Sequence, residues 1–479
     1  MAKQQVVADE TSAAGSKLTG SGADLWNVRE HVERPASKIP VVYDVDVAVA
    51  GGGISGMLAA IAAGRLGAKT LVVEPFGCLG GNMGPGMFAG GSLHLALQNP
   101  EAFKNGLGGL PQEFNERVTD GEKRNVGTNK FRDSKKVPYV ATVMLEEAGV
   151  EILLSSLVVD VITEGNKVCG IFVENKSGTL AIKSKVVVDC TGTADIADRA
   201  GAPVAELAQN PSMGSFFAVD GVDGKKYVEA KEALGELGND DKLWMAQHGV
   251  ESPHFMPWAR EAWESGEFEI SQVVGDFAVL DLSPMPVKVE TTVFSCRTRV
   301  NGNFHPGDGL ALSKIQQRMW PFLYEFVCFL NNRVPGFEDA GLSVVSPYFQ
   351  ARGGKSIDSE YMLTHDDVKK GARFDDLMFT YYDDKIFVEG GCDVPYRMII
   401  PKGVDGLIAA GRSAMKRGPQ FRQRYCAQLM GQAAGVAAAL SAQHDVAPRD
   451  LDTRTLQKAL YETGSEMGPE SRVRELGLV

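Results

Sequence analysis

The apolar residues of the chain fall into runs that suit buried strands and runs that suit packed helices. Residues 45–50 are almost continuously apolar and rich in β-branched side chains, as in a central parallel strand that is buried on both faces. Three glycines follow at 51–53, and small residues then recur on one helical face as far as Gly67, which predicts a tight turn and a closely packed helix. A second apolar strand is predicted at residues 70–73. This region therefore predicts a strand, a helix and a second strand of one parallel sheet.

Two later regions add further strands and a helix. Three strand-like runs between residues 151 and 189 are separated by turn sequences at 164–166 and 175–178, which predicts an antiparallel meander. Towards the other end, residues 406–410 form an apolar strand that breaks at a glycine, and a long helix rich in alanine and glycine begins near residue 423. Strands from distant parts of the chain are therefore available for one sheet.

Length and composition narrow the class of protein. The chain has 479 residues, enough for two or three domains, and its 44% hydrophobic and 23% charged residues are the ordinary mixture of a folded globular protein. The 49 Lys and Arg residues against 61 Asp and Glu give a net charge of −12, so the overall field repels nucleic acids and anionic membranes. We therefore expect no nucleic-acid partner.

Cysteine spacing and low-charge segments bear on the compartment and on membrane association. The seven cysteines are scattered and form no C-x-x-C pair, which predicts reduced thiols in a cytoplasmic protein and no metal site. Residues 47–64 carry little charge, but three consecutive glycines favour a strand, turn and helix over a membrane span. Residues 1–40 mix charged residues with Ser and Gly and contain no apolar signal-peptide core, so we expect a flexible tail or arm.

The first turn carries a dinucleotide-binding pattern. Residues 51–56 match G-x-G-x-x-G, in which the first glycine allows a sharp turn, the second admits a pyrophosphate and the third lets helix and strand pack closely. Glu74 ends the second strand, where a carboxylate accepts hydrogen bonds from a ribose and disfavours a 2′-phosphate. The helix N-terminus at Ile54 and Ser55 adds amide groups and a positive dipole end for the phosphates. A strand–helix–strand unit without a ligand requires neither the three glycines nor the acid.

A second glycine-rich segment follows, running from Cys78 to Gly86 after Glu74-Pro75. With this segment the sequence resembles the FAD-dependent oxidoreductases of the glutathione reductase-like superfamily, in the branch related to the fumarate reductase and succinate dehydrogenase flavoproteins. The resemblance covers most of the chain after about residue 40, and it extends to the strand and small-residue turn at 185–192 and to the late strand and helix at 406–435. It implies a bound FAD. No second G-x-G-x-x-G follows a strand, so a dedicated NAD(P)H domain is not expected.

The resemblance implies an α/β fold. It consists of a Rossmann-like FAD-binding domain of the glutathione reductase type with a β-meander, interrupted by an inserted α+β substrate domain. The expected divisions are 1–40 for the N-terminal tail or arm, 41–203 for the first part of the FAD-binding domain, 204–346 for the insertion and 347–479 for the second part of the FAD-binding domain. Inside the insertion we expect a strand at 287–300 and a helix at 313–331. Its large aromatic residues are expected in the core, namely Trp244, Trp258, Trp263 and Trp320.

The resemblance also implies which residues contact FAD. Glu74 falls at the adenosine ribose, the loop after it passes the pyrophosphate, and the meander closes the adenine end near Leu157 or Val158. The late helix points its N-terminus at the pyrimidine side of the flavin, where a positive dipole end stabilises the negative charge of the reduced ring. The complete expected set is Gly51, Gly53, Ile54, Ser55, Gly56, Glu74, Pro75, Gly80, Gly81, Asn82, Met83, Val158, Thr191, Gly192, Gly411, Arg412, Arg424, Tyr425 and Cys426.

Four residues are candidates for the chemistry beside the flavin. His305 lies in a turn after a strand and can titrate near neutral pH, although an exposed loop histidine is the simpler interpretation. Arg352 stands in a segment that is richer in arginine in the family, and here two glycines follow it. Arg422 and Arg424 precede the flavin-facing helix, where two like charges are costly unless an anion is near. We expect these four residues to be catalytic or to bind the substrate.

Together these features predict an FAD-dependent oxidoreductase that transfers a hydride between a small polar organic substrate and flavin N5. The substrate is expected to be anionic or polyhydroxylated, in an arginine-lined pocket between the two domains, and the sequence is compatible with a homo-oligomer. Two alternatives stay open. One is a flavoprotein whose FAD is not a redox partner, such as a hydratase or isomerase, and the other is an electron-transfer flavoprotein subunit. A large insertion disfavours the second, since shuttling electrons requires no substrate domain.

Overall fold

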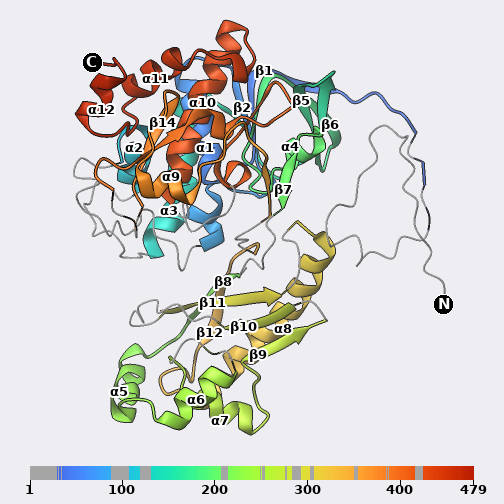
Figure 1. The fold of residues 1–479 in the computed structure, drawn as a ribbon. Helices are drawn as coiled ribbons and strands as arrows, with labels where there is room; N and C mark the ends of the chain where they lie inside the picture. Colours follow the sequence, from blue (N-terminus) through green and yellow to red (C-terminus); the bar gives the residue numbers. More distant parts are fainter. Residues whose placement is uncertain are drawn as a thin grey trace, which may run out of the picture.

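We describe a computed structural model of the chain, which has two lobes that each contain a β-sheet (Figure 1). The described residues are 30, 32–33, 35–87, 107–118, 131–206, 214–248, 250, 254–275, 278–282, 293–302, 307–349, 354–383, 386, 388–415 and 424–479, with the backbone alone described at 131–135, 281–282, 293–297 and 301. No helix in this described part is long and apolar enough to cross a bilayer.

The first lobe is built on a seven-stranded sheet. Its strands are β1 (Val41–Ala50), β2 (Thr70–Val73), β3 (Glu151–Leu153), β4 (Leu157–Glu164), β5 (Lys167–Asn175), β6 (Gly178–Asp189) and β16 (Leu407–Ala409). The spatial order is β3-β2-β1-β6-β5-β4, and β16 also pairs with β6. Strands β4, β5 and β6 form an antiparallel meander, whereas β6 pairs in parallel with both β1 and β16. The carboxyl ends of β1, β2, β6 and β16 consequently lie along one edge of the sheet.

Two helices of small residues pack against each other beside this sheet. Helix α1 (Ile54–Arg65) follows β1, and α10 (Arg424–His444) comes from near the end of the sequence (Figure 1). A Cβ on Gly431 would lie 2.3 Å from the Ser55 carbonyl oxygen, and one on Gly435 would lie 2.1 Å from the Ala59 carbonyl oxygen. The glycines of α10 therefore allow the two backbones to approach more closely than any other residue permits.

Shorter elements complete the first lobe. The helices are α2 (Gly109–Val118), α3 (Phe131–Glu147), α4 (Asp195–Arg199), α9 (His365–Lys370), α11 (Thr453–Glu462) and α12 (Glu470–Glu475). The single turns of 3₁₀ helix are η2 (Gly81–Met83), η3 (Pro85–Met87), η4 (Tyr396–Ile399), η5 (Gly411–Ala414) and η6 (Pro448–Asp450). Two antiparallel strand pairs join β7 (Val204–Glu206) to β13 (Lys355–Ile357) and β14 (Leu377–Tyr381) to β15 (Cys392–Pro395).

The second lobe is a separate antiparallel sheet with helices on it. Its strands are β8 (Phe216–Asp220), β9 (Ser271–Val274), β10 (Ala278–Leu282), β11 (Val293–Gly302) and β12 (Gly341–Val345), in the order β12-β8-β11-β10-β9. Its helices are α5 (Gly224–Leu234), α6 (Asn239–Gln247), α7 (Trp258–Glu264) and α8 (Gly309–Arg333). Aromatic residues from α8 and the preceding loops form its core, with Phe268 stacked on Phe329 at a centroid separation of 5.1 Å.

The structure confirms the α/β class and the main predicted elements. The meander is present, and the helix expected at 313–331 extends over Gly309–Arg333. Of the strand expected at 287–300, residues 287–292 lie outside the described residues and the remainder belongs to β11. The expectation that Trp320 is a core residue is wrong, because 55% of it is exposed on the outer side of α8. The domain boundaries at 203/204 and 346/347 stay a prediction.

Candidate functional site

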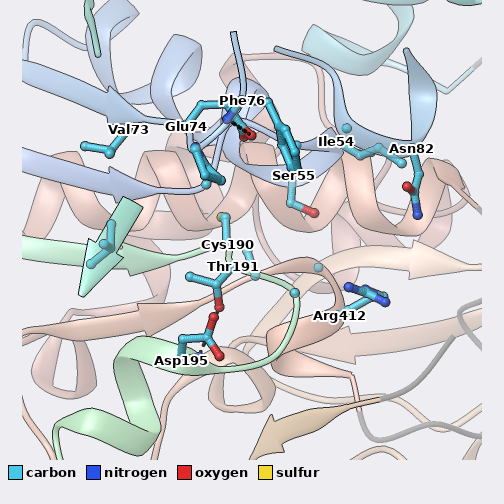
Figure 2. Close-up of a pocket in the computed structure, with 18 of the residues that line it drawn as sticks. Ile54, Ser55, Val73, Glu74, Phe76, Asn82, Cys190, Thr191, Asp195 and Arg412 are labelled. Atoms are coloured by element: carbon cyan, nitrogen blue, oxygen red, sulfur yellow. Dashed lines mark hydrogen bonds between the residues drawn. The ribbon is translucent and has the colours of Figure 1, made fainter. Parts of the chain in front are cut away.

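A cavity of about 300 Å³ opens where the carboxyl ends of β1, β2, β6 and β16 meet (Figure 2). Cavities at this edge of open α/β sheets are typical ligand sites. It is lined by Gly51, Gly53, Ile54, Ser55, Val73, Glu74, Pro75, Phe76, Gly81, Asn82, Leu157, Val158, Cys190, Thr191, Gly192, Asp195, Tyr348, Phe349, Ala410, Gly411, Arg412 and Ala427. Segments from the beginning, middle and end of the sequence thus share one wall.

The turn between β1 and α1 forms one side of this cavity. Gly51 has a φ of +100°, and a Cβ there would lie 2.5 Å from the Cys190 carbonyl oxygen, so only glycine fits. Gly53, in contrast, has a φ of −73°, and within the described part of the chain no atom lies within 4 Å of its ideal Cβ position. Helix α1 begins at Ile54 without a side-chain cap and has no acidic residue in its first turn. Its first amides are therefore available to an anion in the cavity.

Glu74 lies at the end of β2 and is only 6% exposed. Its Oε2 accepts a hydrogen bond of 2.8 Å from the Gly52 amide, and its Oε1 accepts one of 3.1 Å from the Phe76 amide. These two bonds fix the plane of the carboxylate, and each oxygen retains a lone pair for a hydroxyl donor. Burial raises the pKa of Glu74, and the two amide bonds oppose this shift.

The opposite side of the cavity is built from the end of β6 and the turn after β16. Gly192 has a φ of +82°, and a Cβ there would lie 2.7 Å from Arg412 Nη2, so the guanidinium passes directly over the glycine. Figure 2 shows Thr191 and Asp195 across the cavity from Glu74 and Phe76. Burial lowers the pKa of Arg412, while Asp195 and Tyr348 favour its charged form. The described wall of the cavity thus brings the Arg412 guanidinium together with two acidic side chains, Glu74 and Asp195.

A buried aspartate, Asp189, lies behind the cavity wall at the end of β6 and holds the turn after this strand in place. Asp189 is fully buried at the end of β6, and its Oδ1 accepts hydrogen bonds from the Thr191 amide, the Thr191 hydroxyl and the Ser413 hydroxyl. Its Oδ2 accepts from the amides of Ile196 and Ala197 at 3.1 Å each. Ser413 in turn accepts from the Gly192 amide at 2.9 Å. This network fixes the turn after β6 against the turn that carries Arg412.

Most of the predicted FAD-contact residues lie on this cavity. Those in its wall are Gly51, Gly53, Ile54, Ser55, Glu74, Pro75, Gly81, Asn82, Val158, Thr191, Gly192, Gly411 and Arg412. Three others support the wall from behind: Gly56 packs on Gly51, Gly80 bonds its amide to the Gly52 carbonyl, and Met83 is buried.

The three predicted contacts at the start of α10 lie elsewhere. Tyr425 is 1% exposed and turns away from the cavity, donating to the Tyr382 carbonyl oxygen at 2.7 Å, and Cys426 is buried in the core. Neither placement supports a direct contact with a ligand of the cavity. Arg424 does not line it either, and burial lowers the pKa of Arg424 to about 10. The other candidates for chemistry, His305, Arg352 and Arg422, lie outside the described residues.

The sequence prediction missed several residues of the wall. Ala410 and Cys190 lie at predicted strand ends, and Phe76 and Asp195 lie within six residues after one, and that position is the signal by which they could have been included. Ala427 lies one turn into α10, where its carbonyl accepts from the Ser55 hydroxyl at 2.8 Å. Tyr348 and Phe349 come from the segment after β12, and no motif marks them. Burial and the neighbouring Asp189 raise the pKa of Cys190 well above its usual value, which favours the protonated thiol.

The residues of the cavity fit an extended dinucleotide. The open space at Gly53 and the uncapped start of α1 suit a pyrophosphate, and Arg412 adds positive charge. The fixed carboxylate of Glu74 suits a ribose diol, since it can accept from two hydroxyls.

Comparisons with known proteins agree with this chemistry. The family described as FAD dependent oxidoreductase matches residues 46–460. Thiamine thiazole synthase of Methanococcus maripaludis (strain C5) is 32% identical over 162 residues, which is 32% of this chain and 57% of that protein. The enzyme of the same name from Methanococcoides burtonii is 32% identical over 200 residues, covering 40% of this chain and 70% of that protein. The chain thus spans little more than half of the length of the first of these relatives.

Solved structures have more distant similarity. A geranylgeranyl bacteriochlorophyll reductase-like protein from Thermoplasma acidophilum has a TM-score of 0.41 and 14% identity, with 88% of this chain and 84% of that one covered. A flavin-dependent brominase has a TM-score of 0.39 and 13% identity, with 87% of this chain and 84% of that one covered.

Proposed function

This chain belongs to the FAD dependent oxidoreductase family, and we propose that it transfers a hydride between a small polar organic substrate and the flavin. The chain is an FAD-dependent enzyme, and its cofactor is FAD. When bound, FAD would supply a hydride acceptor or donor at the ring nitrogen N5, a redox function that no protein side chain can replace. The observation that carries the proposal is the cavity itself, because it combines a phosphate-binding helix start, a fixed diol acceptor and a cation.

We assign the adenosine and pyrophosphate half of FAD to this cavity. The amides of Ile54 and Ser55 bind the pyrophosphate, Glu74 accepts from the adenosine ribose, and Leu157 and Val158 cover the adenine end. Arg412 offsets the charge of the phosphates. This assignment leaves the flavin half of the cofactor for the region towards the start of α10.

On the substrate side, the proposal rests on Arg424 and on the second lobe. With a pKa of about 10, Arg424 remains a cation at neutral pH, and it begins the helix that is aimed at the flavin in the family. A cation in this position suits an anionic substrate, because a carboxylate can pair with it while the substrate carbon faces the ring. His305, Arg352 and Arg422 remain proposed partners in the same pocket.

A direct test is anaerobic mixing of the holoenzyme with panels of hydroxy acids, sugars and unsaturated acids while flavin absorbance is recorded. We expect one class to bleach the flavin, or to reoxidise the reduced enzyme.

The Arg424→Met variant should raise the half-saturating substrate concentration by about 10-fold to 30-fold, as expected for losing a buried ion pair, and Arg424→Lys should recover much of that loss. Turnover without any change in flavin absorbance would instead favour a hydratase or isomerase.

The raised pKa of Glu74 predicts a pH dependence of FAD binding. In the FAD-free protein burial favours the protonated carboxyl, whereas hydroxyl donors of the ribose favour the carboxylate. Protons therefore compete with FAD, and affinity should fall by up to about tenfold per pH unit as the pH drops below the pKa of the FAD-free protein. Fluorescence titrations of the apoprotein with FAD, from neutral to mildly acidic pH, measure this change in affinity. The Glu74→Gln variant should bind at least about tenfold more weakly at neutral pH and lose the pH dependence; an unchanged pH profile in this variant contradicts the assignment.

A further inference from the structure

The segment that leaves β12 of the second lobe enters the cavity of the first. Ser346 ties this segment down: its amide donates to the Phe216 carbonyl at 2.7 Å, and its hydroxyl donates to the Gly86 carbonyl at 2.9 Å. Two residues later, Tyr348 stacks on Phe76 with ring centroids 4.5 Å apart and planes inclined by 25°. The second lobe thus contributes an aromatic side chain directly beside Glu74.

The first lobe has a fitted space for this side chain. A Cβ on Gly86 would lie 2.5 Å from the Tyr348 hydroxyl, and one on Gly81 would lie 3.7 Å from the same oxygen. Both glycines belong to the loop that follows Glu74 in the sequence. The phenol therefore spans from Phe76, next to Glu74, to the glycine loop beside Asn82, and it lies in the wall of the cavity rather than behind it.

We propose that Tyr348 is an FAD-contact residue, supplied by the second lobe to the adenosine and pyrophosphate half of the cofactor. Its ring, backed by Phe76, covers the nucleotide as an aromatic wall, and its hydroxyl donates to an oxygen of the nucleotide. Burial raises the pKa of Tyr348, so the phenol is protonated and available as a donor. This contact makes FAD binding depend on the position of the second lobe, because Tyr348 and the anchoring Ser346 lie on one short segment.

The inference rests on the proposed placement of FAD but not on the proposed substrate, so it is tested by binding alone. Purified apoprotein is titrated with FAD, ADP and FMN, and FAD release is timed by fluorescence. In Tyr348→Ala we expect FAD and ADP affinity to fall by about 10-fold to 100-fold, the range for loss of one aromatic contact with a nucleotide. Weak FMN binding should not change, since FMN lacks the adenosine half.

Matched variants separate contact from folding. Tyr348→Phe keeps the ring and loses one hydrogen bond, so its affinity should fall by about 2-fold to 10-fold. Gly86→Ala, whose Cβ conflicts with the Tyr348 hydroxyl, should weaken FAD binding through displacement of the ring. Tyr324→Ala removes an exposed tyrosine of α8 in the second lobe and should have no effect. Circular dichroism of each apoprotein establishes that it is folded.

Two results overturn the inference. Unchanged affinity of folded Tyr348→Ala for FAD and ADP means that the ring does not touch the cofactor. Tighter binding means that Tyr348 merely fills the cavity and must leave before FAD enters. Weaker FAD binding in Tyr348→Ala together with a failure of every substrate to bleach the flavin would leave this inference standing and reject the proposed hydride transfer.

Discussion

The Gly53→Ala variant is expected to fold normally and to lose FAD. Gly53 has a φ of −73°, which alanine adopts readily, and no atom of the described residues lies within 4 Å of its ideal Cβ position. In the proposed complex that space is filled by the pyrophosphate, so the added methyl group meets the cofactor and none of the described residues. We expect FAD affinity to fall by about 100-fold, comparable with the cost of overpacking a close contact, and apoprotein stability to change by less than about 1 kcal/mol.

Gly56→Ala is the matched comparison, three residues further along the same helix start. Its Cβ would lie 1.8 Å from the Gly51 carbonyl oxygen and 3.0 Å from the Cys190 Cβ, so β1, β6 and α1 must all shift. Glycine to alanine inside a helix normally stabilises a protein by about 1 kcal/mol, but here we expect a loss of about 3 kcal/mol or more.

Both variants are measured by thermal unfolding of the apoprotein and by FAD titration. If Gly53→Ala binds FAD as tightly as the natural chain, the pyrophosphate does not lie at the start of α1. If Gly56→Ala is as stable as the natural chain, the close approach of α1 to the first turn is wrong. The two residues occupy the same motif, so opposite outcomes separate a ligand contact from a packing contact.

The part of the site that the sequence predicts well is the part formed by local backbone geometry. Gly51 has a positive φ, Gly56 contacts the Gly51 backbone, and Glu74 ends the strand that follows, so all three belong to one strand–helix–strand unit. Such constraints can be recognised in a sequence from the spacing of the glycines and of the acidic residue. The same reasoning found the strand ends at Thr191 and Arg412, because parallel strands present their carboxyl ends at a common edge.

The start of α10 shows what residue spacing alone does not determine. A helix turns by 100° per residue, so consecutive residues face different surroundings. Ala427 faces the cavity, whereas Tyr425 points to Tyr382 and Cys426 into the core. The motif located the helix but not its rotation, which is fixed by the contact of Gly431 with Ser55.

Tyr348 could not be predicted for a different reason. It lies more than 260 residues from its partners Phe76 and Gly86, in a segment that returns from the second lobe. Only the tertiary arrangement of the two lobes brings them together. For Trp320 the sequence led to a wrong prediction. Its apolar side chain suggested a core residue, but it lies on the outer face of α8 and is exposed.

Removal of the Asp189 carboxylate is expected to be the most destabilising single change in the first lobe. Five hydrogen-bond donors converge on this fully buried side chain, three on Oδ1 and two on Oδ2. In Asp189→Ala the backbone amides of Thr191, Ile196 and Ala197 lose their acceptors inside the protein. We expect a loss of about 3–5 kcal/mol, the range for removing one partner from a buried charged network. FAD binding should fall as well, because Thr191 and Gly192 are fixed through this network.

The measurement must report on the first lobe. Four of the five tryptophans lie in the second lobe and Trp26 lies outside the described residues, so intrinsic fluorescence is a poor probe. Hydrogen exchange of the peptide containing Ile196 and Ala197, together with thermal unfolding followed by circular dichroism, reports directly on the network. Asp160→Ala is a suitable control, because the Asp160 carboxylate accepts a local bond from the Val161 amide, and its loss should cost less than about 1 kcal/mol.

The Asp189→Asn variant distinguishes the ionised from the protonated acid. Burial raises the pKa of Asp189, and the hydrogen bonds from Thr191 and Ala197 oppose that shift. If the carboxylate is ionised, both of its oxygens accept hydrogen bonds. The asparagine side chain has only one oxygen, so its NH₂ group must face other donors: either the backbone amides of Ile196 and Ala197 or the donors of Thr191 and Ser413. Asn should then be nearly as destabilising as Ala. Natural stability of Asp189→Asn would mean that the acid is protonated and that one hydroxyl donor is reversed, which contradicts the network of five donors.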